Sequence, residues 1–497
     1  MTLTHEQITE KTKMLHFNGK AFINGKLVDA LSGKTFDCIN PATGKLLTKV
    51  AACDEKDIHT AVLAARKAFL SGYWSTCSLE KRKLTLLKLA DLIEKHQFTI
   101  ALMETLDTGK PIKDSLSGDI PWAARCIRWY AESIDKIYGQ VAPTDPHILA
   151  YITREALGVI GAVTPWNFPF YLACAKLAPA LVVGNSLILK PAEQAPLTTI
   201  YLAQLASEAG VPDGVLNVIP GFGETAGKAL GMHPDVDGIS FTGSTEVGKL
   251  FLKYSSESNM KRIFLECGGK SPNIVFDDCS DLSKAAESSA REVFLNQGEV
   301  CCAPTRLLVQ DTIKKPFLEK LIKAAKQFHP QDPLKPDTMM GAIIDQVQTD
   351  KIMNYIQSGL SDGASILLGG KRLYEETGGY FIEPTIFDDA KHNMKIACEE
   401  IFGPVLTVFT FKTMDEAINM ANNTHYGLAA SVWTSHINKA HQMAKAIRAG
   451  VVSINCISSG DITTPFGGYK QSGLGRELSL HALDHYTETK TTWIDLS

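Results

Sequence analysis

The sequence predicts an α/β protein with two doubly wound, mostly parallel sheets, and three observations carry that prediction. A chain of 497 residues is too long for one hydrophobic core and indicates two or three domains. From about residue 158, buried strand patterns alternate with helical patterns, which is the element order of a parallel sheet. A second series of strands begins near Ser271, so we expect two α/β domains joined near residues 266–270.

The individual elements follow from local signals. Residues 22–52 carry β-strand patterns broken by glycine-containing turns. A helix is expected after Asp54, a good N-cap residue, and others over about 79–107 and 119–137. Gly210 ends an amphipathic helix of the alternating part. The strands of the two series are expected in GVIGAVTP (158–165), NSLILKPA (185–192), GVLNVIPG (214–221) and DGISFTGS (237–244), then in NIVF (273–276), RLLV (306–309) and PTIF (384–387).

Composition excludes several classes of function. The formal net charge is -4 and no basic stripe appears, so we expect no nucleic-acid partner. The longest apolar run, 177–189, is interrupted by proline, glycine and asparagine, so we expect no membrane span. The 11 cysteines are odd in number and show no zinc-type spacing, which predicts reduced thiols, a cytoplasmic protein and no metal site.

Two glycine-rich loops follow predicted strands and open helices. They are GFGETAG (221–227) and FTGSTEVG (241–248), and the dinucleotide pattern GxGxxG is absent. The exposed N–H groups of a helix N-terminus can hold a phosphate. Glycine at such a turn is commonly only turn geometry, but two loops in successive units favour nucleotide binding.

Eight motifs then occur in an order that resembles one family. They are PWNFP (165–169), KPAE (190–193), GFG (221–223), FTGSTEVG (241–248), ECGGKSPNIVF (266–276), NQGEVC (296–301), EEIFGPV (399–405) and PFGGYKQSGLGRE (465–477). Together they resemble the NAD(P)-dependent aldehyde dehydrogenase superfamily over nearly the whole chain. Within it, the sequence is most similar to bacterial aminoaldehyde and γ-glutamyl-γ-aminobutyraldehyde dehydrogenases.

The resemblance implies three catalytic residues. Cys301, three residues after the glycine of NQGEVC, matches the nucleophile, and its neighbour Cys302 is then a packing residue or a second thiol beside the substrate. Asn167 matches the side-chain donor to the oxyanion, although asparagine also commonly stabilises turns. Glu266 matches the general base that activates water.

The resemblance also implies a cofactor site. Lys190 and Glu193 match residues that reach the adenosine ribose, and the Glu193 carboxylate should repel the extra phosphate of NADP, so we expect NAD. Glu400 and Phe402 match residues that hold the nicotinamide ribose. The other expected cofactor contacts are Thr164, Pro165, Trp166, Asn167, Gly223, Phe241, Gly243, Ser244, Val247 and Gly268.

The substrate is expected to be an aldehyde, and an amino- or γ-glutamylamino-aldehyde of putrescine breakdown is favoured. Asp119 and Asp461 could attract an ammonium group, but either could equally be a solvated surface acid. Tyr171 and Ala175 differ from close relatives, and we place them with Cys302 and Phe466 around the substrate. Alternatives are an aliphatic, aromatic or betaine aldehyde, or a catalytically silent relative that only binds ligands.

The resemblance finally implies a domain organisation. Residues 1–137 and 157–265 are expected to form the NAD-binding domain and 266–480 the catalytic domain. Segments 138–156 and 481–497 should form a small sheet for subunit association. Apolar and other residues alternate along both segments, which fits edge strands that need a partner, so we expect a homodimer or homotetramer.

Overall fold

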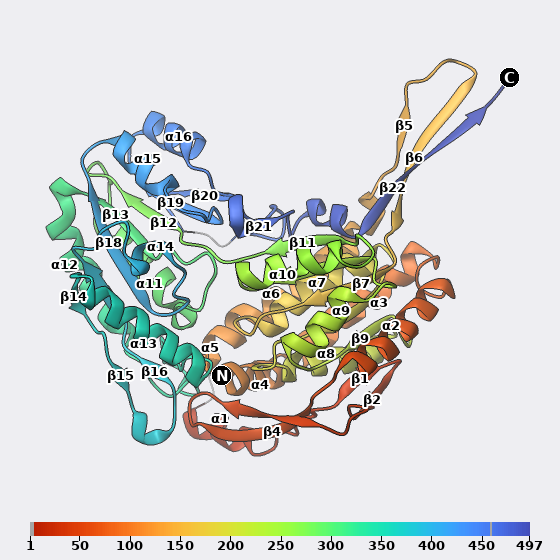
Figure 1. The fold of residues 1–497 in the computed structure, drawn as a ribbon, viewed down its shortest axis with the longest axis horizontal. Helices are drawn as coiled ribbons and strands as arrows, with labels where there is room; N and C mark the ends of the chain where they lie inside the picture. The colour runs from red at the N-terminus through yellow and green to blue at the C-terminus, as the bar shows by residue number, and fades with distance from the viewer. Residues whose placement is uncertain (1–3, 458–459) are drawn as a thin grey trace.

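The structure is a computed structural model that describes residues 4–457 and 460–497. Two bodies lie side by side, each built around a sheet with helices packed against it, and a thin arm of strands projects from one of them (Figure 1). This arrangement confirms the predicted fold class of two α/β sheets and an additional small one.

The first sheet has the strand order β2-β1-β9-β8-β7-β10-β11-β21. Its five central strands are parallel, and the pairings at both edges are antiparallel. The chain winds from β7 to β9 in one direction and then to β10 and β11 in the other, so the switch point lies between β7 and β10. Ligands bind outside the carboxyl ends of strands at such a point. The strands are β1 (Ala21–Ile23), β2 (Lys26–Val28), β7 (Val159–Val163), β8 (Ser186–Lys190), β9 (Leu216–Val218), β10 (Gly238–Thr242), β11 (Arg262–Glu266) and β21 (Gly473–Leu474).

The helices of the first body follow the predicted signals, with one difference. Asp54 caps α2 by accepting from the Lys56 N–H, and Gly210 ends α8 in the left-handed conformation with φ 106°. The stretch 79–107 forms two helices, because His96 leaves helical backbone angles between α3 and α4. The helices are α1 (His5–Thr12), α2 (Glu55–Leu70), α3 (Leu79–Lys95), α4 (Gln97–Thr108), α5 (Ile112–Asp114), α6 (Ile120–Ser133), α7 (Pro169–Val182), α8 (Leu197–Ala209), α9 (Lys228–Met232) and α10 (Thr245–Ser256).

The second sheet has the order β14-β17-β18-β13-β12-β19-β20 and is parallel except at β14. Three of its strands, β12, β13 and β17, are those predicted in NIVF, RLLV and PTIF. Its strands and helices are β12 (Pro272–Val275), β13 (Arg306–Gln310), β14 (Ser365–Leu368), β17 (Thr385–Asp388), β18 (Val405–Phe411), β19 (Ala429–Trp433) and β20 (Val451–Ile454), with α11 (Leu282–Phe294), α12 (Lys314–Ala325), α13 (Gln346–Ser361), α14 (Lys395–Cys398), α15 (Met414–Asn422) and α16 (Ile437–Ala446).

The projecting arm is a three-stranded antiparallel sheet. It consists of β5 (Gln140–Ala142), β6 (Ile148–Ala156) and β22 (Thr487–Asp495), in the order β22-β6-β5 (Figure 1). Two further hairpins complete the fold: β3 (Thr35–Asn40) with β4 (Lys45–Ala51), and β15 (Arg372–Leu373) with β16 (Phe381–Ile382).

One strand departs from the expected division of the chain. β21 lies within the range 266–480, yet it pairs with β11 at the edge of the first sheet, with Gly473 opposite Glu266. The chain therefore returns to the first body before it forms the arm. Among the described residues, no helix is long and apolar enough to cross a membrane, and no group of His, Cys, Asp or Glu side chains is arranged to hold a metal ion.

Candidate active site

The candidate residues gather where the central strands of the first sheet end. Thr164 to Asn167 follow β7, Lys190 ends β8, and Glu266 ends β11. Cys301 comes from the second body, in the turn after α11 and before β13. The site is therefore built from both bodies, at the edge where a doubly wound sheet binds ligands.

The turn before Cys301 has an unusual backbone. α11 ends at Phe294, and three left-handed residues follow from position 296: Asn296 with φ 48°, Gln297 with φ 58° and Gly298 with φ 73°. Such conformations cost about 1–3 kcal/mol at non-glycine residues and persist only where the surroundings hold them. Two side-chain hydrogen bonds hold the turn. The Asn296 amide donates to the Glu299 carbonyl, and the Gln297 Oε1 accepts from the Gly341 N–H at 3.0 Å.

Asn167 is tied to this turn in both directions. Its Nδ2 donates to the Glu299 carbonyl at 2.8 Å, and the Asn296 Nδ2 donates to the Asn167 carbonyl at 3.1 Å. Asn167 is only 4% exposed, and its Oδ1 has no hydrogen-bond partner among the described residues. The structure thus brings Asn167 beside the turn that carries Cys301.

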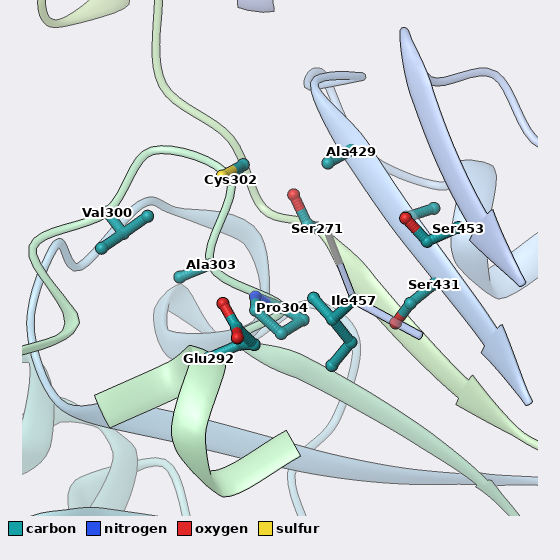
Figure 2. A pocket seen from close by; sticks show the side chains of 11 residues that line it. Ser271, Glu292, Val300, Cys302, Ala303, Pro304, Ala429, Ser431, Ser453 and Ile457 are labelled. Carbon is teal, nitrogen blue, oxygen red and sulfur yellow. The ribbon is translucent and has the colours of Figure 1, made fainter. Parts of the chain in front are cut away.

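The two adjacent cysteines have different surroundings. Cys301 is half-buried, whereas Cys302 packs with Leu428 and Ala429. Figure 2 shows a small pocket over the second sheet with Cys302 among the side chains that line it. Hydrogen bonding to the Cys302 thiol, followed by burial, raises the pKa of Cys301 well above its usual value. Cys301 therefore needs a base to become a thiolate.

Glu266 is a buried carboxylate without a direct partner. It is 5% exposed, and neither side-chain oxygen has a hydrogen-bond partner among the described residues. Burial raises its pKa well above the usual value, the charge of Glu477 raises it further, and Lys176 and Arg476 oppose this shift. A Cβ on Gly467 would lie 2.6 Å from the Glu266 Oε1, so only glycine leaves room for the carboxylate.

Sequence reasoning missed the pair Lys176 and Glu477. Lys176 is fully buried, donates to the Glu477 carboxylate, and also donates to the Ser240 Oγ at 3.1 Å. A signal was present, because Lys176 is the one charged residue in the sequence of the otherwise apolar α7. A buried charge is retained in proteins only with a partner.

The expected adenosine-side residues lie around β8 and the loops after β9 and β10. Lys190 pairs with Glu193 at 3.0 Å. Gly223 has open space where a Cβ would point, and Ser244 caps α10 by accepting from the Val247 N–H at 3.2 Å. The Phe241 ring is buried in the core against Phe251, and its contact with the cofactor stays a prediction.

The expected nicotinamide-side residues also cluster. The Gly269 N–H donates to the Glu400 Oε1 at 3.0 Å, and a Cβ on Gly268 would collide with that carboxylate. Burial raises the pKa of Glu400 to about 7. Trp166 and Phe402 meet edge to face at 5.2 Å, next to Pro165 in the chain. The Thr164 Oγ1 and Thr242 Oγ1 are buried without partners among the described residues, as expected for groups that meet a ligand or water.

The predicted substrate acids are not free. Asp119 is bonded to the ammonium of buried Lys110 at 2.5 Å, and Asp461 pairs with Arg125 at 2.9 Å. Each acid therefore already has a cationic partner, and its attraction for a substrate amine stays a prediction. Sequence alone did not show this, because each partner lies elsewhere in the chain.

The other residues that we expected around the substrate differ in their exposure and in their distance from the candidate thiol. Ala175 is only 3% exposed and packs in the main hydrophobic cluster, so it offers little surface to a ligand. Tyr171 is half-buried on the same helix, and burial, then the charges of nearby groups that include Cys301, raise its pKa. Phe466 packs against the cluster that contains Cys301 and Cys302. Tyr171 and Phe466 therefore remain near the candidate thiol.

This fold and site define an α/β enzyme that binds its ligands where parallel strands end and that presents a thiol, an amide and a buried carboxylate there. The chain belongs to the aldehyde dehydrogenase family, whose model matches residues 27–492. It is an oxidoreductase that acts on aldehydes.

Three relatives illustrate how similar this chain is to other members of the family. The Escherichia coli NADP/NAD-dependent aldehyde dehydrogenase PuuC is 52% identical, over 98% of each chain. A Pseudomonas syringae indole-3-acetaldehyde dehydrogenase, solved as a cysteine-to-alanine mutant with NAD+ and IAA, is 54% identical over 100% of both chains, with a TM-score of 0.99. A γ-glutamyl-γ-aminobutyraldehyde dehydrogenase from Burkholderia cenocepacia is 51% identical over 100% of both chains, with a TM-score of 0.98.

Replacing Glu477 tests the electrostatics of Glu266. In Glu477→Gln the charge that raises the pKa of Glu266 is removed, while Lys176, which lowers it, keeps an acceptor. The pKa of Glu266 should fall, so the acidic limb of the activity profile for aldehyde oxidation should move to lower pH. Glu292→Gln, which changes a carboxylate outside this group, should leave the profile in place. A shift to higher pH, or none, contradicts this electrostatic coupling.

Proposed function

We propose that this enzyme oxidises aldehydes to acids with NAD, with Cys301 as nucleophile, Asn167 as oxyanion donor and Glu266 as general base. The observation that carries the proposal is the pair of hydrogen bonds that hold Asn167 against the Cys301 turn, at 2.8 and 3.1 Å. Glu266, buried with both oxygens unpartnered among the described residues, is free to accept a proton from water or from the thiol.

The reaction follows from these positions. The Cys301 sulfur, once its proton has passed to Glu266 and from there to solvent, adds to the aldehyde carbon, and the negative oxygen receives hydrogen bonds from the Asn167 amide and a backbone N–H. Losing one such donor typically costs about 10²–10³ in rate. A bound NAD would supply the acceptor for the hydride of this carbon, so that the Cys301 adduct would become a thioester. Glu266 then takes a proton from water as the water attacks the thioester, which releases the acid and restores the thiol.

The chain's own residues favour NAD over NADP. The Thr164 and Thr242 hydroxyls, which have no hydrogen-bond partner within the described ranges, and the open space at Gly223 fit a bound dinucleotide. Lys190 and Glu193 would hold the adenosine ribose, and Glu400 and Phe402 the nicotinamide ribose. The Glu193 carboxylate opposes a 2′-phosphate at that position, which supports a preference for NAD.

For the substrate we favour a γ-glutamylamino-aldehyde. A relative at 51% identity is named for γ-glutamyl-γ-aminobutyraldehyde, which supports an aldehyde of this kind. A free aminoaldehyde is less favoured, because Asp119 and Asp461 already pair with Lys110 and Arg125. Indole-3-acetaldehyde is the second candidate, since a relative of 54% identity is named for it.

We further propose that the first sheet forms the NAD-binding domain, the second the catalytic domain, and the arm an association surface. The arm projects from the body and exposes large apolar side chains, among them Val141 at 71% and Trp493 at 66% (Figure 1). Exposed strand edges with apolar residues favour pairing with another chain.

Sedimentation at micromolar concentration tests this last proposal. We expect a dimer or tetramer, and removal of residues 487–497, which carry β22, should shift the distribution towards monomer. A monomeric full-length chain contradicts the proposal.

Serine substitutions at the adjacent cysteines test the catalytic assignment. Cys301→Ser should lower kcat by roughly 10³-fold or more, because a hydroxyl replaces the nucleophilic thiol. NAD binding, measured by calorimetry, should persist, since the nucleotide residues are unchanged. Cys302→Ser is the matched control and should keep most activity. Reversed results show that the nucleophile has been placed one residue too early.

An aldehyde panel tests substrate and cofactor together. The kcat/KM values of γ-glutamyl-γ-aminobutyraldehyde, 4-aminobutanal, indole-3-acetaldehyde and butanal are compared with NAD and with NADP. We expect the γ-glutamylated aldehyde to rank first. NAD should be favoured by about tenfold, the factor given by a repulsion of about 1.4 kcal/mol. A first rank for indole-3-acetaldehyde, or equal use of NADP, overturns the corresponding part of the proposal.

A further inference from the structure

Lys110 is a charged side chain buried beside the candidate site, although it was not among the predicted site residues. Its side chain is 1% exposed. The ammonium lies 2.5 Å from the Asp119 carboxylate, 3.9 Å from that of Glu104, and 4.1 Å from the centre of the Phe168 ring. Burying an ammonium costs several kcal/mol unless such partners surround it.

The local backbone is shaped to make these contacts. Gly109 ends α4 in the left-handed conformation with φ 78°, and Lys110 follows at once. Residues 115–119 form a π-helical turn between α5 and α6, and Asp119 is its last residue. π-Helical turns of this kind are rare and frequently mark functional sites. Here the turn delivers the Asp119 carboxylate to Lys110.

The Lys110 turn meets the candidate site through Phe168. Phe168 directly follows Asn167 and is the N-cap residue of α7, and the Lys110 ammonium lies under its ring. A cation over an aromatic ring is worth up to about 2 kcal/mol when water is excluded. Lys110 therefore restrains the residue next to the proposed oxyanion donor.

The turn that carries Lys110 is also connected to the Cys301 loop by a series of hydrogen bonds. The Gly109 carbonyl accepts from the Ala342 N–H at 2.9 Å. Residues on either side of Ala342 contact the cysteine loop. The Gly341 N–H donates to the Gln297 Oε1 at 3.0 Å, and the Ile344 N–H donates to the Glu299 Oε1 at 3.1 Å. The Glu299 carbonyl in turn accepts from the Asn167 amide. Both ends of the Asn167 contact are thus tied to the turn that carries Lys110.

We propose that Lys110 is a positioning residue for the oxidation of every aldehyde substrate: clamped by Asp119, it holds Phe168 and thereby keeps the Asn167 amide aimed at the carbonyl oxygen. Asp119 then acts on the reaction through Lys110 and not by attracting a substrate amine. This inference rests on the proposed role of Asn167 as oxyanion donor.

A double-mutant cycle tests it. Lys110→Met keeps an unbranched apolar stem against Phe168 and removes the charge. It should lower kcat/KM for butanal at saturating NAD by about 10²-fold, the cost of a small misplacement of a catalytic group. In an Asn167→Ala background the same change should have little further effect, since the group it positions is absent. Lys113→Met, a neighbouring lysine that contacts the Met339 sulfur, is the matched control and should leave kcat/KM unchanged.

The outcomes separate the two proposals. If Asn167→Ala leaves kcat/KM unchanged, the oxyanion role fails and the inference falls with it. If Asn167→Ala lowers kcat/KM but Lys110→Met lowers it by the same factor in both backgrounds, Lys110 does not act through Asn167, and only the inference is overturned. Thermal unfolding midpoints of all variants, measured in parallel, show whether a loss follows stability instead of position.

Asp119→Asn gives a milder second test, because it keeps an acceptor for Lys110. It should lower kcat/KM for 4-aminobutanal and for butanal by the same factor, and KM for the two should change alike. A rise in KM confined to 4-aminobutanal would mean that Asp119 selects a cationic substrate, and this would falsify its assignment as a clamp.

Discussion

The exchange of hydrogen bonds between Asn167 and the 296–299 turn is the contact on which the rest of the site depends. One partner follows a strand of the first sheet, and the other precedes the thiol loop of the second body. Both accepting carbonyls are buried, where an unmade hydrogen bond costs about 1–3 kcal/mol. The two bodies therefore cannot separate at this point without a free-energy penalty. This keeps the Cys301 loop next to the Asn167 amide.

Around this contact the protein forms three ion pairs that involve buried side chains. Lys176 with Glu477, Lys110 with Asp119 and Lys190 with Glu193 each neutralise a charge near the site. Glu266 is different, because neither of its carboxylate oxygens has a hydrogen-bond partner among the described residues, and the charges of Lys176 and Arg476 act on it only through space. This difference is consistent with the proposed role of Glu266 as the general base.

Prediction from the sequence was confirmed where the signal was local, whereas the ion-pair partners of the candidate acids could not be predicted. The strands in NIVF and RLLV and the N-cap at Asp54 were predicted correctly, because periodicity and capping act within a few residues. The charge-selection role of Asp119 and Asp461 was predicted from their position near the expected substrate. The structure shows both acids already paired. A carboxylate looks the same in the sequence whether or not a cation lies beside it.

By itself the sequence determined the order of the elements, the family and the identity of the candidate thiol, amide and carboxylate. Hydrophobic periodicity, turn residues and ordered motifs are all properties of short stretches of chain. Only the tertiary structure decided which ionisable groups are paired and which have no direct partner among the described residues. Lys176 and Glu477 are 301 positions apart, and Asn167 and Glu299 are 132 apart. Such pairs form because folding brings both partners together and removes water from them. No pattern within a short stretch of sequence indicates which residues will meet.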